Sequence, residues 1–212
     1  MCGIWLYLTH NQTDISYETM INNFMSISGR GPDNFKLISL KDKYTIGFHR
    51  LSIMDISVKG SQPFEYVDKT TNIKYTCICN GEIYNANFLK ENYLNDFNFE
   101  SDSDCEVIIP LYLKFQEKFV SYLDGVFAIV LIKEQDDDIE YILVRDRIGV
   151  RPMYIGLDEN KNYVIGSELK SIKNIAINAS QFTPGSIKRI KYDGKFYNER
   201  TDKYYNLNQV TR

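Results

Sequence analysis

Histidine, cysteine and long apolar runs are scarce in this sequence of 212 residues, and each scarcity excludes a class of protein. Two histidines, His10 and His49, are too few for the common zinc sites, and Cys77-Ile78-Cys79 lacks the spacing of a Cys-x-x-Cys pair. Four cysteines, at positions 2, 77, 79 and 105, are too few and too irregularly spaced for a disulfide framework. We therefore expect no bound metal, and we expect the thiols to be reduced.

Signals for membranes and for nucleic acids are also lacking. The first residues, Met1 to Leu6, have neither a positive segment nor an apolar run long enough for a signal peptide, and no later stretch could span a bilayer. Lysine and arginine number 25 against 28 aspartates and glutamates, and the net charge of -3 gives no basic face for phosphate contacts. We expect a cytoplasmic protein that binds small molecules or proteins, with no nucleic acid and no membrane as partner.

The residues that are present are typical of a folded globular protein. Hydrophobic residues make up 43%, aromatic residues 14% and charged residues 25%, and no linker or repeat interrupts the chain, which favours one large domain. Many strands, few helices and no regular βαβ alternation predict an α+β layered fold with mostly antiparallel sheets. The predicted strands, rich in β-branched and aromatic residues, cover 2–8, 44–49, 73–80, 125–133, 139–145, 153–156, 163–166 and 187–192.

Three helices are predicted from apolar spacing and from capping residues. Ser16 can cap a helix that follows it directly, and residues 84–95 suit a short amphipathic helix. Ser103-Asp104-Cys105-Glu106 has the spacing of a capping box, which predicts a third helix over residues 105–115. Pro110 lies inside that third helix and is expected to kink it.

Cys2 and the dipeptide Asn80-Gly81 are the positions that suggest chemistry. A small second residue is compatible with removal of Met1, which would leave Cys2 with a free α-amine. Such an amine has a reference pKa of about 7.7 to 8.0, so its neutral fraction can accept the thiol proton. Asn80-Gly81 predicts a tight turn at the end of a strand, after which backbone N–H groups can point outward together. Taken alone, Cys2 is better explained as a small buried residue at the start of a strand.

A series of short motifs along the chain favours a catalytic interpretation of Cys2 over a structural one. In order they are Cys2-Gly3-Ile4, Arg30-Gly31-Pro32-Asp33, His49-Arg50-Leu51-Ser52-Ile53-Met54-Asp55, Gln62-Pro63, Asn80-Gly81-Glu82-Ile83-Tyr84-Asn85, Ser103-Asp104-Cys105-Glu106, Leu123-Asp124-Gly125-Val126-Phe127-Ala128, Arg145-Asp146, Gly149-Val150-Arg151-Pro152 and Gly166-Ser167-Glu168-Leu169-Lys170. Together they resemble the glutaminase half of asparagine synthetase. Gly29 departs from the pattern, because many relatives have histidine there.

The resemblance implies a class II glutamine amidotransferase domain over residues 2–192, followed by a tail over 193–212 that leads towards a synthetase domain. The implied fold is that of the N-terminal-nucleophile hydrolases, a four-layer αββα sandwich of mostly antiparallel sheets. The implied reaction is hydrolysis of free glutamine to glutamate and ammonia, with Cys2 as nucleophile.

The resemblance also assigns roles in the glutamine site. Asn80 and Gly81 would hold the oxyanion with a side-chain amide and a backbone N–H. Arg50 would bind the α-carboxylate of glutamine, because a planar guanidinium can donate two parallel hydrogen bonds to it. Glu82 and Asp104 would supply negative charge for the α-ammonium, and Asp104 would also suit the first turn of a helix.

The remaining motif residues are expected to serve the structure or the pocket wall. Residues after Arg50 would line the glutamine pocket with backbone groups, their side chains being compatible with plain core packing: Leu51, Ser52, Ile53 and Met54. Cys77, Cys79 and Cys105 are expected to be core thiols, residues 145–152 a structural loop, and Asp102 a solvated neighbour of Asp104.

Nothing in the sequence resembles the Ser-Gly-Gly-Leu-Asp-Ser loop with which the family's other half binds ATP. ATP and magnesium are therefore expected only in that absent half, and glutamine hydrolysis itself is expected to need no cofactor. The expected partners are free glutamine and a synthetase domain or subunit that receives the ammonia; a homodimer is compatible with the sequence. Three functions stay open: a glutaminase for asparagine synthesis, an amidotransferase for another acceptor, and an inactive glutamine-binding module if Met1 is retained.

Overall fold

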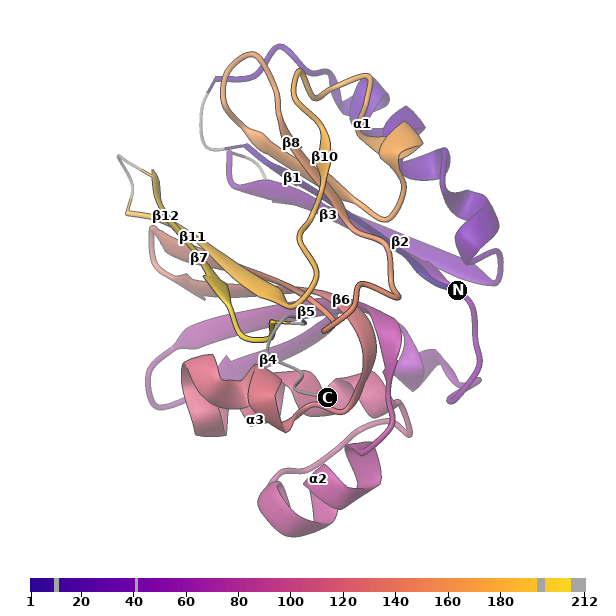
Figure 1. Ribbon diagram of the computed structural model, residues 1–212, viewed down its shortest axis with the longest axis vertical. Coiled ribbons are helices and arrows are strands. Elements are labelled where there is room, and N and C mark those ends of the chain that lie inside the picture. The colour runs from indigo at the N-terminus through magenta and orange to yellow at the C-terminus, as the bar shows by residue number, and fades with distance from the viewer. Residues whose placement is uncertain (10–11, 41, 194–196, 207–212) are drawn as a thin grey trace. The chain divides into compact units, whose positions relative to one another are not determined.

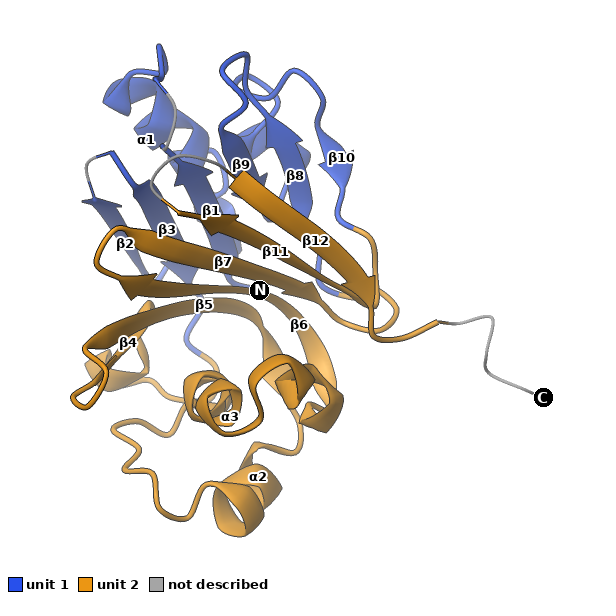
Figure 2. Cartoon of the chain, turned by 90° about the vertical axis from the view of Figure 1, so that its left-hand side faces the viewer, with its two compact units in different colours: residues 1–52, 151–182 blue, residues 53–150, 183–212 orange. Residues whose placement is uncertain are grey.

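The chain folds into two compact units that alternate along the sequence. The computed structural model describes residues 1–9, 12–40, 42–193 and 197–206. Unit 1 comprises residues 1–52 and 151–182, and unit 2 comprises residues 53–150 and 183–212 (Figure 2). Each unit contains one six-stranded sheet, and every strand pair of the described residues in these sheets is antiparallel.

Unit 1 is built around β1 (Gly3–Leu8), which Figure 1 labels, and all six residues of this strand are buried. Helix α1 (Tyr17–Met25) begins as predicted, because the Ser16 side chain accepts a hydrogen bond from the Thr19 N–H. Phe24 of this helix packs against Trp5 of β1 in an apolar cluster. The strand order is β10 (Ser180–Gln181), β8 (Tyr154–Leu157), β9 (Tyr163–Gly166), β1 (Gly3–Leu8), β3 (Tyr44–Arg50) and β2 (Asn34–Leu40).

Unit 2 contains the longer strands and a second apolar core. Helices α2 (Ala86–Tyr93) and α3 (Ile108–Phe115) lie on one face of its sheet, as Figure 1 shows, and their apolar residues join that core. The strand order is β12 (Tyr197–Lys203), β11 (Ser186–Tyr192), β7 (Asp138–Arg145), β6 (Gly125–Gln135), β5 (Ile73–Ile83) and β4 (Phe64–Asp68). Part of the predicted tail, residues 194–196 and 207–212, lies outside the described residues, as does His10.

The predicted end of β5 at Asn80-Gly81 is wrong. The strand continues to Ile83, and Gly81 pairs with Phe127 of β6 in an unbroken register without a positive φ angle. Side chains alternate along a strand, so Cys79 and Ile83 join the core on the helix side and Asn80 points to the opposite face. The Asn-Gly pair therefore belongs to a central strand and forms no hairpin turn.

The predicted third helix exists, but it begins differently. Residues Asp104–Val107 form a 3-10 turn, η3, and the Ser103 side chain makes no capping hydrogen bond. The Glu106 carboxylate instead accepts hydrogen bonds from the N–H groups of Glu100 and Ser101, at 2.8 and 2.9 Å. Because α3 starts only at Ile108, Pro110 falls in its first turn, where a proline removes no helix hydrogen bond.

The predicted strands are otherwise confirmed to within a few residues, and four further strands were not predicted. These are β2, β4, β10 and β12. They are the outermost strands of the two sheets. Few apolar side chains are needed at a sheet edge, so the alternation of apolar and polar residues in the sequence is weak there. Within the described part of the chain, no helix has the length and apolar character that a bilayer crossing requires.

Candidate functional site

Cys2 lies immediately before β1, at the point where the strand leaves the sheet of unit 1. Its thiol is half-buried against the first residue after β3: the Leu51 N–H donates to Sγ at 3.4 Å, and Sγ lies 3.6 Å from the Leu51 carbonyl oxygen. Cys2 thus directly precedes a strand, and its sulfur makes polar contacts to backbone groups, whereas the side chains of β1 are buried.

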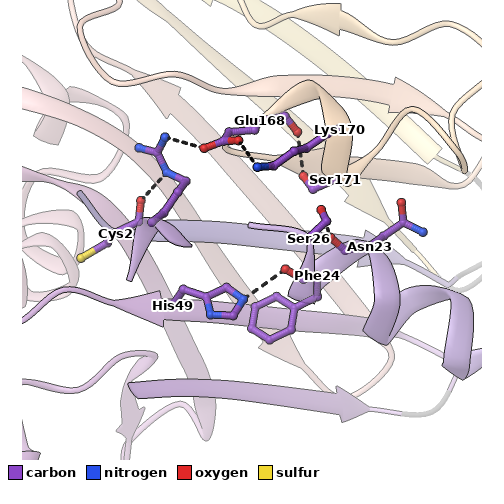
Figure 3. Close-up of polar contacts among 9 residues, drawn as sticks. Cys2, Asn23, Phe24, Ser26, His49, Glu168, Lys170 and Ser171 are labelled. Carbon is purple, nitrogen blue, oxygen red and sulfur yellow. Dashed lines mark hydrogen bonds and ion pairs between the residues drawn. The ribbon is translucent and has the colours of Figure 1, made fainter. Parts of the chain in front are cut away.

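The backbone of Cys2 is held by the side chain of Arg30, which is in turn paired with Glu168. Arg30 Nε donates to the Cys2 carbonyl at 2.8 Å, and Arg30 Nη1 contacts Glu168 at 3.1 Å. Glu168 also pairs with Lys170 at 2.9 Å. Figure 3 shows the sulfur of Cys2 directed away from Glu168 and Lys170. Strand β1 is fixed beyond this point because the Ile4 N–H donates to Ser167 Oγ at 2.9 Å.

Burial raises the pKa of the Cys2 thiol above its ordinary value. The Leu51 N–H and the positive charges of Arg50 and Arg151 act in the opposite direction, but desolvation is the larger effect. The thiol is therefore protonated near neutral pH, and a base must remove its proton before it can act as a nucleophile.

Arg50 ends β3 and is 7% exposed, which excludes the ordinary surface ion pair. The Arg30-Gly31-Pro32-Asp33 motif packs against its backbone: the Asp33 N–H donates to the Arg50 carbonyl at 3.1 Å. Gly31 is required for this approach, since a Cβ there would lie 2.4 Å from the His49 carbonyl carbon and oxygen. The Asp33 carboxylate accepts from the Ser52 N–H at 2.7 Å, so this motif fixes the segment that follows Arg50.

The four residues after Arg50 divide between the two units. Leu51 and Ser52 belong to unit 1 and have the backbone contacts described above. Ile53 and Met54 belong to unit 2, and their side chains are 60% and 62% exposed. The expectation that these side chains suit plain core packing is therefore wrong for Ile53 and Met54, and whether the run lines a glutamine pocket stays a prediction.

Asn80 is a deeply buried polar residue of β5. Its side chain is 1% exposed, and its Nδ2 has no hydrogen-bond partner among the described residues. An unpaired buried amide donor costs about 1 to 3 kcal/mol, so a central strand would not retain one for stability. The Asn80 amide is available to donate to a ligand.

The N–H of Gly81 faces the outer edge of β5, away from β6. The Tyr84 N–H donates to the Asp124 carbonyl, and the carbonyl of Phe127, which stands opposite Gly81, accepts from the Asp146 N–H. Backbone groups alternate sides along an antiparallel strand, so Gly81 and Ile83 face outward. Gly81 also has to be a glycine, because a Cβ would lie 2.5 Å from the Val126 carbonyl oxygen.

Asp104 closes the outer edge of β5 next to Gly81. One oxygen of its carboxylate accepts from the Ile83 N–H at 2.6 Å. Burial raises the pKa of Asp104, with a smaller upward contribution from the charge of Glu82, although backbone N–H groups partly offset this. Glu82 is half-buried. The two predicted ammonium-binding carboxylates thus belong to unit 2: Glu82 follows Gly81 in sequence, and Asp104 is hydrogen-bonded to Ile83, two residues beyond Gly81.

The other motif residues are structural where they were expected to be. Cys77, Cys79 and Cys105 are buried core thiols. Asp146 is 1% exposed and accepts hydrogen bonds from backbone N–H groups of its loop, and Arg145 Nη2 donates to the Gly149 carbonyl at 2.8 Å. No cluster of three or more metal-binding side chains occurs in the described ranges.

Three polar residues with contacts near the candidate groups received no role from sequence reasoning. They are Arg30, Glu168 and Gln62, and each occurs in one of the recognised motifs. The contacts that join them to Cys2, Cys79 and each other span 17 to 138 positions, which no local pattern indicates. Membership of a motif was the signal that could have singled them out.

Fold comparison finds the same fold in a solved amidotransferase structure. The structure of glutamine phosphoribosylpyrophosphate amidotransferase from B. subtilis matches with a TM-score of 0.76, covering 96% of this chain and 49% of that chain, at 20% sequence identity. A match at this level of identity shows the fold, and the predicted α+β fold of N-terminal-nucleophile type is confirmed.

A family model then identifies the chain more closely. The model described as a glutamine amidotransferase domain matches residues 1–204, and the chain belongs to this family. Similar relatives are the probable glutamine-hydrolysing asparagine synthetase of Acanthamoeba polyphaga mimivirus, 35% identical over 87% of this chain, and asparagine synthetase 3 of Arabidopsis thaliana, 36% identical over 93% of it. The chain spans about a third of the length of these relatives, 33% in each case.

Proposed function

We propose that this domain hydrolyses free glutamine to glutamate and ammonia, with Cys2 as the nucleophile after removal of Met1. The observation that carries the proposal is the buried Asn80 amide, whose Nδ2 has no partner among the described residues. It is next in sequence to Gly81, whose N–H faces the outer edge of β5. Two such donors are what a developing oxyanion requires. Met1 is 51% exposed, which supports its accessibility to an aminopeptidase.

The nucleophilic step follows from the state of the Cys2 thiol. Since burial keeps this thiol protonated, the α-amine of a terminal Cys2 serves as the base and accepts the thiol proton. The sulfur attacks the carboxamide carbon, and the carbonyl π electrons move to oxygen. Arg30, which binds the Cys2 carbonyl, keeps the backbone of the nucleophile in place during attack.

Ammonia leaves when the tetrahedral intermediate collapses. The C–N bond breaks, the protonated α-amine returns its proton to the departing nitrogen, and a thioester to Cys2 remains. Water then attacks the thioester with the amine again as base, releasing glutamate and restoring the thiol. Asn80 and Gly81 donate to the oxyanion in both halves of the reaction, so the chemistry needs neither ATP nor a metal.

Substrate selection is assigned to charged side chains of the site motifs. Arg50 binds the α-carboxylate of free glutamine through two parallel hydrogen bonds. Glu82 and Asp104 bind the α-ammonium, whose positive charge favours the ionised form of Asp104 and offsets the effect of burial on its pKa. A glutamine within a peptide lacks both charges and is rejected.

The ammonia is proposed to serve asparagine synthesis in an ATP-dependent synthetase part. The names of the relatives support this acceptor, and they describe proteins about three times as long as this chain. We propose that the synthetase part is the partner of this domain and that the domain acts in the cytoplasm.

The test combines intact mass with a glutamine-dependent ammonia assay. We expect the active form to lack Met1, and we expect Cys2→Ala to abolish hydrolysis, with Cys77→Ala as the control for loss of a thiol. The ratio kcat/KM should rise as pH passes the pKa of the α-amine, about 7.7 to 8.0. Ammonia release by a Met1-free Cys2→Ala variant would refute the mechanism. Glutamine binding without turnover by a form that retains Met1 would favour the inactive binding module.

A further inference from the structure

Three features in succession make hydrogen bonds to the outer edge of β5: strand β4, the side chain of Gln62 and the carboxylate of Asp104. Backbone groups of every second residue face this edge, and Cys77, which pairs with Phe64, is the last of them that β4 covers. Strand β4 begins at Phe64, so it does not reach the next outward positions, Cys79, Gly81 and Ile83. The stretch that carries the proposed oxyanion donor therefore lies beyond the end of the neighbouring strand.

The side chain of Gln62 takes the place of that missing strand at Cys79. The Cys79 N–H donates to Gln62 Oε1 at 2.6 Å, and Gln62 Nε2 donates to the Cys79 carbonyl at 3.2 Å. A primary amide presents one acceptor and one donor side by side, as a backbone residue of a paired strand does. Gln62 is 6% exposed, so water does not compete for these two hydrogen bonds.

Asp104 secures the same edge on the far side of Gly81, through its hydrogen bond from the Ile83 N–H. Gly81 itself receives a weak contact at its carbonyl from Cys105 Sγ, at 3.8 Å. Its N–H lies between two clamped residues, Cys79 and Ile83, and points outward. The direction of this N–H is consequently set by the residues on either side of it.

We infer that Gln62 is a positioning residue for the oxyanion hole: it holds the backbone of Cys79 and thereby fixes the direction in which the Gly81 N–H points. The inference rests on the proposed glutaminase function and extends it to a residue that contacts backbone alone. Oxyanion donors act over a narrow range of distance, so a shift of β5 lowers the rate of the chemical step while glutamine binding through Arg50 is retained.

The test compares Gln62→Met, which keeps the volume and removes both hydrogen bonds, with the control Ile78→Val, which weakens packing in the same strand. For Gln62→Met we expect kcat to fall about 10- to 100-fold while KM changes less than about threefold. The aldehyde analogue of glutamine, which forms a tetrahedral adduct with the Cys2 thiol, should lose affinity by the same factor as kcat. Ile78→Val should lower Tm and leave both quantities unchanged.

Gln62→Glu provides a readout that a purely structural role would not change. At neutral pH its carboxylate faces the Cys79 carbonyl with an acceptor, and protonation restores the donor. Activity relative to wild type should therefore recover as pH falls, and this holds even if Gln62→Met fails to fold.

The outcomes separate the inference from the function on which it rests. If wild type releases no ammonia, the proposed function fails. If wild type is active and Gln62→Met keeps its kcat, or if Gln62→Glu shows no recovery at low pH, the positioning role is wrong. A fall of kcat in Gln62→Met that merely parallels its loss of Tm, as in a destabilised Ile78 variant, also overturns it.

Discussion

The two units present their candidate groups in different ways. In unit 1, Cys2 and Arg50 lie at the ends of β1 and β3, where the backbone leaves the sheet, and Arg30 and Asp33 hold the chain there. In unit 2, Asn80 and Gly81 lie inside an 11-residue strand that is paired with β6 from Lys74 to Ile83. The candidate groups of unit 1 are thus held by side chains at strand ends, whereas those of unit 2 belong to a hydrogen-bonded strand pair.

This difference determines what a substitution should cost. At a strand end, the side chains that hold the backbone can be changed with little loss of ladder hydrogen bonds. Inside a ladder, a backbone change disturbs the paired strand, so stability and activity fall together. A side-chain change that leaves the ladder intact should separate the two.

The largest effect is expected for Asn80→Ala. Removing one oxyanion donor should lower kcat about 100- to 1000-fold, whereas stability should change by less than about 1 kcal/mol, because Nδ2 has no partner to lose. Ammonia release and urea unfolding measure the two quantities. A variant that is inactive because it has unfolded would contradict the separation of stability from activity in β5.

Gly81→Ala should instead show the cost of a backbone change. Its Cβ would meet the Val126 carbonyl oxygen at 2.5 Å and Phe127 Cα at 2.8 Å, so we expect a loss of about 1 to 3 kcal/mol in the free energy of unfolding, accompanied by loss of activity. Gly29→Ala is the matched control, because nothing lies within 4 Å of a Cβ there. Equal stability of the two variants would contradict this expectation, because it would show that the β5–β6 pair accommodates a Cβ at Gly81 without loss of stability.

Arg50→Lys tests the unit 1 set. An ammonium cannot reproduce two parallel hydrogen bonds to a carboxylate, so KM for glutamine should rise about tenfold with a smaller change in kcat. Steady-state kinetics measure both, and thermal unfolding should be close to that of wild type. A fall in kcat at unchanged KM would argue against the carboxylate role.

The smallest effect is expected from the pH dependence of Asp104. Its folded pKa is raised by burial, so its contribution to stability is fully present below the unfolded pKa and is lost as pH rises through the folded pKa. Asp104→Asn lacks this loss. The free energy of unfolding of the variant, relative to wild type, should therefore increase between pH 4 and pH 7 in urea titrations. A constant difference would show that the raised pKa has no consequence for folding.

Strongly alternating or fully apolar segments were predictable as strands. Residues 163–166 and 139–145 appear in the structure almost as predicted, because four to eight apolar and β-branched residues in succession suit a buried strand. The edge strand β4 was missed, since none of its five residues is fully buried and no second apolar face is required there. Asn80-Gly81 was misread as a turn, because local propensity favours a hairpin and pairing with β6 overrides it.

The candidate residues were named from motifs, but their environments were not. Nothing local to Asn80 indicates that its amide is buried without a partner, and nothing local to Glu106 indicates that it accepts from residues 100 and 101 instead of capping a helix. Ile53 and Met54 were expected to suit the core and are exposed. Burial depends on segments distant in sequence, which a pattern of neighbours does not contain.

The sequence by itself determined the family of this domain, its α+β class and the identity of the candidate groups. Motifs and periodicity involve residues that are close in sequence, so they can be recognised without the fold. The tertiary structure decided how Cys2 is held by Arg30, how Gly81 comes to face the edge of its strand, and that Gln62 replaces a strand at Cys79. The contacts of Arg30 and Gln62 join residues 28 and 17 positions apart, and their hydrogen bonds form only when folding brings the segments together.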